Sequence, residues 1–316
     1  MALYIFALVD DDVKEIELDK IKKSYKTVWV RAIMPDENEI KILSDMTSAP
    51  VEEFKEFLLQ DERPRLDINR YLQVIFRAPI MAEEETTTVP INIFIDKNTV
   101  VTVEKQRIKP LDRFQDLIPM KKARFLFRHN PGYFLYHILD RINDMFLLNI
   151  DKIANTLDIF EKSASSTLTK ESVEKIYEKS VTLTVFNQAL ISNIEVLNAL
   201  RKSYTKLISN MNKRQFNDLY YEALQILDTE KIQRDVIANL FNIQAIIASN
   251  KMNNLIKRLT AITLIFMIPA AVSGIFGMNF RHIPLSESSY GFMIITLLTV
   301  MVAVIAFFGF KNIDWI

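Results

Sequence analysis

The chain contains 316 residues, of which 39 are basic and 39 acidic, so its formal net charge is zero. This balance offers no basic excess for binding nucleic acid, and a chain without cysteine has neither disulfides nor thiolate metal sites. The length allows more than one folding unit, and the three histidines are too scattered for a zinc cluster: His129, His137 and His282.

The N-terminal hexapeptide is apolar and is soon followed by Asp10, Asp11 and Asp12. It lacks the basic region of a signal peptide, so we interpret it as a first strand and expect this part of the chain to be cytosolic. Five runs rich in Val, Ile, Phe and Thr predict strands at residues 3–9, 27–33, 71–78, 91–95 and 99–103. Helices are predicted at 36–45, 50–59 and 111–118, which makes residues 1–130 a mixed α/β domain. We interpret the run from Glu83 to Thr88 as a solvated hairpin tip rather than a metal site.

Residues 131–209 are expected to form long antiparallel helices. From residue 133 to residue 268 the sequence contains neither glycine nor proline, which turn-dependent β structure requires. A break is predicted at residues 163–167, with Thr169 as the N-cap of the second helix. A third helix is predicted from Asn210, without a stop signal before Pro269. Its 68 residues up to Gly277 would extend about 100 Å, so residues 210–258 are interpreted as a stalk that leads into a membrane.

Two uncharged segments near the C-terminus are each long enough to cross a bilayer, residues 259–280 and 290–310. The alternative is a pair of buried core helices. A loop at 281–289 joins the two spans, and a tail follows at 311–316. Lys257, Arg258 and Lys311 flank one side, against Arg281 in the loop, which favours cytoplasmic N- and C-termini in a multi-pass protein of the cell membrane.

Two spans in one chain cannot enclose an aqueous path, so a pore requires several copies around an axis. The first span is the better lining, because it contains polar residues such as Thr263 and Ser273 and small residues that permit close helix approach. The second span is almost entirely aliphatic and aromatic, and we expect it to face lipid.

The first span ends in Phe276-Gly277-Met278-Asn279. This motif, at the end of the first of two C-terminal spans, resembles the signature of the CorA family of magnesium transporters. Further similarities to the family are Leu259-Thr260 at the start of the span, Met267 and Pro269 near its middle, and Trp315-Ile316 in the tail. The resemblance implies an α/β cytosolic domain, a helical stalk, two transmembrane helices, a homopentamer and transport of Mg²⁺.

Asn279 has a physical case of its own. Mg²⁺ sheds its octahedral water shell reluctantly, so a selective mouth can bind the hydrated ion through hydrogen bonds to its waters. Amide oxygens accept such bonds without holding the ion as carboxylates would. One Asn279 from each subunit would form a ring of these oxygens, with Gly277 and Met278 completing the filter. The alternative is that Asn279 only caps the helix.

Helical spacing places a set of residues below this ring on one face of the first span and the preceding helix. The resemblance implies that this face lines the pore and that a bulky apolar ring closes it, and Met267, Leu259 and Ile256 fit such a constriction. For each of these residues the alternative is ordinary packing. The complete predicted face consists of Asn253, Ile256, Leu259, Thr263, Met267, Ala270 and Gly274.

The resemblance also implies closure by cytosolic Mg²⁺ bound between neighbouring subunits. Alignment on the motif points to Asp218 as a sensing aspartate, and alignment around Arg63-Pro64-Arg65 points to Glu56. The alternative is that both are ordinary exposed carboxylates. The sequence departs from the family where Arg281 and His282 follow the motif, which leaves Glu287 as the only acid of the external loop.

No nucleotide-binding loop and no nucleophile–base set is visible, so we expect neither an enzyme nor a nucleotide-driven pump. The membrane potential supplies about 4.6 kcal/mol per 100 mV for a divalent ion, enough for passive uptake into a negative interior. The expected partners are copies of the chain itself, the lipid bilayer and divalent cations, and no nucleic acid or nucleotide. The alternatives are transport of another divalent ion, such as cobalt, nickel or zinc, and a membrane-anchored coiled-coil scaffold.

Overall fold

The computed structural model describes residues 2–22, 24–82, 85–118, 123–163, 169–203, 210–279, 283–285 and 288–315. These residues form two compact units. The first unit contains the described residues up to Asn239, and the second contains those from Leu240 onward.

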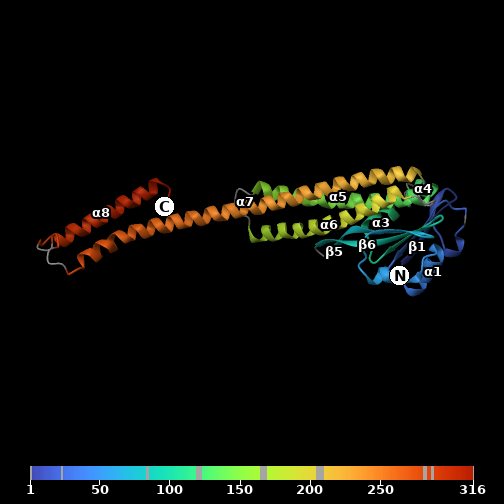
Figure 1. Cartoon of the computed structure of the whole chain (residues 1–316), viewed down its shortest axis with the longest axis horizontal. Coiled ribbons are helices and arrows are strands. Elements are labelled where there is room, and N and C mark those ends of the chain that lie inside the picture. The colour runs from blue at the N-terminus through green and yellow to red at the C-terminus, as the bar shows by residue number, and fades with distance from the viewer. Residues whose placement is uncertain are drawn as a thin grey trace. The chain divides into compact units, whose positions relative to one another are not determined.

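The first unit is built on one seven-stranded sheet, with strand order β2-β1-β3-β7-β6-β5-β4. Figure 1 shows the sheet beside the long helices α5 and α6. The pairs are antiparallel except for β3 and β7, which run parallel in the middle. Every residue of β3 and β7 is buried, as expected for strands covered on both faces. The strands are β1 (Ala2–Val9), β2 (Asp12–Glu15), β3 (Val28–Ile33), β4 (Arg65–Ile68), β5 (Leu72–Ala82), β6 (Glu85–Asp96) and β7 (Thr99–Glu104).

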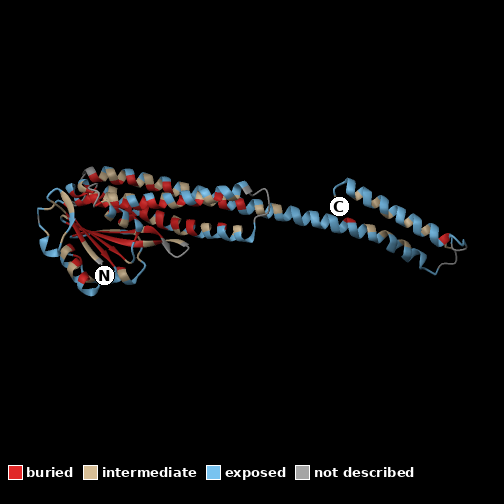
Figure 2. Cartoon of the chain, turned by 180° about the vertical axis from the view of Figure 1, so that it is seen from behind, coloured by how far each residue is buried: buried red, intermediate tan, exposed pale blue. Residues whose placement is uncertain are grey.

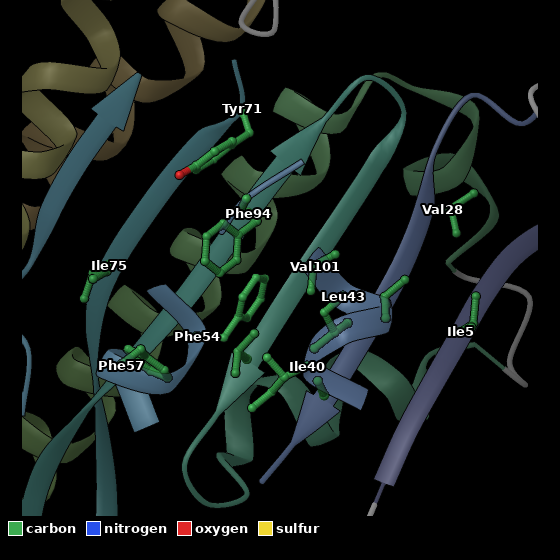
Figure 3. Close-up of a cluster of buried hydrophobic side chains, with 14 of the residues drawn as sticks. Ile5, Val28, Ile40, Leu43, Phe54, Phe57, Tyr71, Ile75, Phe94 and Val101 are labelled. Atoms are coloured by element: carbon green, nitrogen blue, oxygen red, sulfur yellow. The ribbon is translucent and has the colours of Figure 1, made fainter. Parts of the chain in front are cut away.

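Two short helices, α1 (Glu37–Thr47) and α2 (Val51–Leu59), cover one face of the sheet. Phe54 stacks on Phe94 of β6 at 4.5 Å between ring centroids, and Phe57 lies in the same cluster (Figure 3). Helix α1 begins with a capping box, in which Asp36 accepts from the backbone N–H of Glu39 and the Glu39 carboxylate accepts from that of Asp36. The buried apolar stripes of the two helices therefore meet the sheet, and most of their charged residues remain exposed.

The opposite face of the sheet is covered by α3 (Lys109–Asp116), α5 (Pro131–Ser163) and α6 (Lys170–Lys202), and α4 (Arg124–Arg128) lies against β1 and β2. Trp29 is fully buried there, with its ring 5.6 Å from those of both Phe114 and Phe134. On α6, Asn193 accepts a hydrogen bond from the backbone N–H of Arg77 and donates one to its carbonyl, both at 2.9 Å. The amide thereby joins α6 to strand β5.

A buried ion pair crosses the parallel strand pair in the centre of the sheet. The Arg31 guanidinium donates to both carboxylate oxygens of Glu104, at 2.6 and 2.9 Å, and both side chains are almost fully inaccessible. Arg31 also reaches Asp112 and Gln115 of α3, and Glu104 accepts from the backbone N–H of Ile108. These bonds satisfy the charges and join the start of α3 to the sheet.

Helices α5 and α6 run antiparallel, as predicted, and Thr169 caps α6 by accepting from the backbone N–H of Ser172 at 3.2 Å. The third helix, α7 (Asn210–Phe276), is continuous over 67 residues and passes through Pro269, also as predicted. Its first part packs on α5 and α6 through residues spaced three and four apart. The buried ones include Phe216, Leu219, Ala223 and Ile226.

The second unit contains the rest of α7 and helix α8 (Gly291–Asn312). Most residues in both segments are exposed (Figure 2). The helical part of the first predicted span ends at Phe276 rather than Phe280, and the second extends two residues beyond Phe310.

Four short elements were not predicted from the sequence: β2, β4, the 3₁₀ turn Leu18–Lys20 and α4. Each is three to five residues long. The prediction that Glu83–Thr88 forms a solvated hairpin tip was wrong for the three threonines. Thr86, Thr87 and Thr88 belong to strand β6 and pair with β5. Threonine suits a pleated strand better than a turn. Glu83 and Glu84 lie outside the described residues.

Arg31→Met is expected to lower the free energy of unfolding by about 3–5 kcal/mol, because it leaves the Glu104 carboxylate buried without a counterion. The double variant Arg31→Met/Glu104→Leu should recover much of this loss. Unfolding can be followed by Trp29 fluorescence in a Trp315→Phe background, since these are the two tryptophans of the chain. Equal stability of the single and double variants would contradict the assignment of the cost to an unpaired charge.

Candidate functional site: the end of α7 and an acidic cluster on α5 and α7

Helix α7 ends at the motif that the sequence analysis identified. Gly277 donates the last α-helical hydrogen bond, to Ser273 O at 2.9 Å, and Met278 donates to Ile275 O at 3.3 Å. A Cβ atom at position 277 would lie 3.1 Å from the Ser273 carbonyl, so glycine relieves crowding where the helix stops. The turn leaves Asn279 just beyond the helix end.

The Asn279 side chain is exposed and has no hydrogen-bond partner among the residues that the structure describes. Its amide is therefore not occupied by a side-chain hydrogen bond to the described end of α7. Gly277 and Met278 are exposed beside it. Glu287, the predicted acid of the external loop, lies outside the described residues.

The predicted pore-lining face of α7 is exposed at every position, from Asn253 to Gly274. Its apolar members have large, exposed side chains, with exposed fractions of 67% for Leu259, 55% for Met267 and 54% for Ile256. The Thr263 hydroxyl donates to Leu259 O at 2.8 Å, which leaves its oxygen lone pairs free to accept from water.

Helix α8 covers the opposite side of α7. A groove of about 670 Å³ separates the two helices, and its lining from α7 includes Pro269, Val272 and Phe276. At about 100° per residue, these positions lie roughly opposite Thr263, Met267 and Gly274 on the helix circumference. The predicted pore face is thus the face of α7 that its own chain leaves uncovered.

Both helices are long and apolar enough to cross a membrane, and only 6% of the most apolar window in each is buried. A core helix of a soluble domain would be mostly buried, so the low burial favours two membrane spans over this alternative.

Glu56 and Asp218 are both exposed, and they are not brought together within one chain. Glu56 lies on α2, on one side of the sheet, whereas Asp218 lies on α7, which packs on α5 and α6 on the other side. Lys55 next to Glu56 is paired with Glu37 at 3.0 Å. A metal ion could join the two predicted carboxylates only between copies of the chain.

The structure adds acidic residues that the sequence analysis did not single out. Asp140 and Asp144 of α5 lie near Glu222, four residues after Asp218 on α7. Burial and the two aspartates raise the pKa of the Glu222 carboxyl, and burial and Asp144 raise that of Asp140, although Arg141 opposes the shift. Burial and the carboxylates of Asp140, Glu222 and Asp218 raise the pKa of the Tyr136 hydroxyl to about 12.

These four carboxylates, Asp140, Asp144, Asp218 and Glu222, are called the acidic cluster below. Within the described residues no three acidic or histidine side chains are arranged to hold a metal ion without further ligands. Burial and, after it, the neighbouring carboxylates raise the pKa of the Glu222 and Asp140 carboxyls, and a cation beside them would favour their charged forms. The acids occur as pairs four residues apart on two helices, a spacing that could have been noticed in the sequence.

A family model described as "CorA-like Mg2+ transporter protein" matches residues 24–312. The chain is 31% identical to the Cobalt/magnesium transport protein CorA of Methanocaldococcus jannaschii over 97% of both chains. It is 26% identical to the protein of the same name from Thermotoga maritima, over 72% of this chain and 64% of that one. The complete structure of the CorA magnesium transporter from Methanocaldococcus jannaschii superposes with a TM-score of 0.90 and 29% identity, over 100% of this chain and 99% of that one.

Asp140→Asn and Glu222→Gln are each expected to raise the melting temperature by about 1–2 °C at pH 7 without divalent cations, because each removes repulsion between like charges. A carboxyl whose pKa is raised in the folded state weakens stability at neutral pH, and the penalty disappears as the pH falls below about 4. The difference between variant and wild type should therefore vanish at low pH. Adding 10 mM MgCl₂ should stabilise the wild type more than either variant, and equal stabilisation would contradict a cation site here.

Proposed function

Because the chain belongs to the CorA-like Mg²⁺ transporter family, we propose that it carries Mg²⁺ passively into the cytoplasm through a pore formed by α7 from several copies. The observation that carries this proposal is the uncovered face of α7. It is exposed from Asn253 to Gly274, lies opposite α8, and ends at an amide without a partner among the described residues. A membrane helix with polar groups on one uncovered face requires other helices or water against that face.

Five copies, the number that the family resemblance implied, would place five Asn279 amides around an axis. Their oxygens would accept hydrogen bonds from the polarised waters of a hydrated ion. Gly277 and Met278 would set the width of the ring. Further along the face, the bulky side chains of Met267, Leu259 and Ile256 would close the path by excluding water.

Transport needs no nucleotide in this proposal. The membrane potential supplies about 2.3 kcal/mol per charge for each 100 mV, and a divalent ion gains twice that amount on entering a negative interior. The proposal keeps the division made from the sequence into a cytosolic α/β domain, helices, stalk, two spans, external loop and tail. It places both termini in the cytoplasm and the spans in the plasma membrane.

We further propose that intracellular Mg²⁺ closes the pore by binding between subunits. The acidic cluster of one subunit would supply Asp218, Asp140 and Glu222, and the neighbouring subunit would supply Glu56. Bridging these carboxylates relieves their repulsion and favours the state in which they lie close together, provided that this state binds the ion better. As internal Mg²⁺ falls, the repulsion returns and loosens the assembly.

Transport of cobalt is the second candidate, since both relatives named above carry cobalt in their names. An amide ring that binds the ion through its water shell discriminates weakly between divalent ions of similar hydration. Transport of nickel or zinc belongs to the same alternative. Competition between these ions and Mg²⁺ in one flux assay would show which ion the protein prefers.

Asn279→Ala is expected to reduce Mg²⁺ flux into proteoliposomes at least tenfold, because each subunit loses a hydrogen bond to a charged hydrate, worth about 1.5–3 kcal/mol. Asn279→Gln should retain part of the flux. The matched control is Asn254→Ala, an exposed amide on the opposite side of α7 from the predicted face. Unchanged flux in Asn279→Ala would refute the proposed filter.

The double variant Glu56→Gln/Asp218→Asn is expected to abolish the closure of the pore by Mg²⁺ on the cytosolic side, while flux at low internal Mg²⁺ stays at the wild-type level. Flux would be measured in vesicles loaded with increasing MgCl₂. Glu52→Gln/Asp228→Asn removes two exposed acids from the same helices and serves as the control. If both double variants keep wild-type inhibition, the regulatory site lies elsewhere.

A further inference from the structure

The last turn of α8 carries a cap that fixes the position of a tryptophan. The backbone N–H of Trp315 donates to Phe310 O at 3.0 Å, and that of Asp314 donates to Lys311 O at 3.3 Å. Asp314 has a positive φ of 55°. These features define a Schellman motif, and the hydrophobic contact that accompanies it is present, since the Trp315 ring stacks on Phe310 at 5.7 Å. Trp315 is therefore held against the helix end by backbone hydrogen bonds.

Three cations flank the apolar segments at the same end of the helical hairpin. Lys257 and Arg258 precede the apolar part of α7, and Lys311 follows that of α8. All three side chains are exposed, and none has a carboxylate within ion-pairing distance among the described residues. Asp314 is the only described acid beside them, so this end of the second unit carries a net positive charge.

Arg258, one of the two cations on α7, points away from the predicted pore. Arg258 is 11 residues before Pro269 and 18 before Phe276, which at 100° per residue places all three on one side of the helix. Pro269 and Phe276 line the groove against α8. Arg258 therefore faces the same side as α8 and the surrounding bilayer, where it cannot contribute to a ring around the ion path.

We propose that Lys257, Arg258, Lys311 and Trp315 form a binding surface for anionic phospholipid headgroups, in the leaflet where α7 enters and α8 leaves the bilayer. Exposed cations beside a membrane span attract acidic headgroups, and tryptophan with one apolar and one polar edge favours the headgroup level. The charge of the three cations complements a lipid phosphate, and the cap sets the depth of the indole. The proposal requires that the two helices span a bilayer, but it does not depend on which ion passes.

The first test compares lipid association of the full-length protein in nanodiscs of phosphatidylcholine containing 30% phosphatidylglycerol. Each cation near the surface contributes roughly a fivefold preference for an acidic lipid. Lys257→Gln/Arg258→Gln/Lys311→Gln should therefore lower the preference for spin-labelled phosphatidylglycerol over phosphatidylcholine at least tenfold. The control Lys26→Gln/Lys152→Gln/Lys231→Gln removes three exposed lysines from the first unit.

The second test concerns the cap. Asp314→Gly is compatible with a positive φ and should keep Trp315 in place, whereas Asp314→Ile disfavours that conformation. Fluorescence quenching by brominated phosphatidylglycerol should be strong in the wild type and in Asp314→Gly, and at least twofold weaker in Asp314→Ile. Trp29 is fully buried and contributes a constant, unquenched background.

The proposal is overturned if the wild type shows no preference for phosphatidylglycerol, or if the triple variant and its control lose the preference equally. It is also overturned if the triple variant changes Mg²⁺ flux but not lipid preference, since the cations would then contact protein rather than lipid. Loss of transport in Asn279→Ala with unchanged lipid preference would leave this surface intact and separates the two proposals.

Discussion

Helix α7 is continuous from Asn210 to Phe276, but the partners of its side chains change along its length. Up to Leu240 its buried residues recur at helical intervals of three, four or seven positions, and the first of them pack on α5 and α6. Beyond Leu240, Ala261 is the only buried residue among those described in this helix. A helix so apolar and so exposed is stable only in hydrocarbon or against copies of itself. The two-unit organisation, the membrane segments and the need for an assembly all follow from this change of surroundings.

Two kinds of oxygen lie on the same helix and suit two different tasks. Asp218 and Glu222 are carboxylates whose neighbours on α5 concentrate negative charge, and burial raises the cost of that charge at Glu222. Such a cluster is suited to a cation that remains bound. Asn279 offers a neutral amide in an exposed position, which accepts bonds from a hydrated ion without retaining it. Under the proposed function, one helix would therefore both conduct the ion and respond to its concentration.

The sequence predicted the long elements because their signals are strong. The absence of glycine and proline from residue 133 to residue 268 predicted α5, α6 and most of α7, and Thr169 predicted where α6 begins. The four-residue strands β2 and β4 were missed because their apolar residues are too few to show alternation, and their pairing is decided by neighbours in the sheet. The acidic cluster was missed for a related reason. Each pair of acids looks like an ordinary solvated helix face until α5 and α7 are brought together.

Asparagine side chains of α6 join this helix to the sheet on one side and to α7 on the other. Asn193 fixes α6 to β5 through both backbone groups of Arg77, and Asn187 of α6 donates to the buried Glu230 carboxylate of α7 at 2.7 Å. Glu230 occupies a core position where a lone carboxylate would be costly, so its hydrogen bond to Asn187 favours one register between α6 and α7, while its ion pair with Arg234 of the same helix balances its charge. Between Asn210 and Ile268 the helix has no glycine or proline at which to bend. Under the proposed regulation, a displacement of α7 at the cluster would therefore move the helix as a stiff rod, and it would have to strain or break the bond between Asn187 and Glu230.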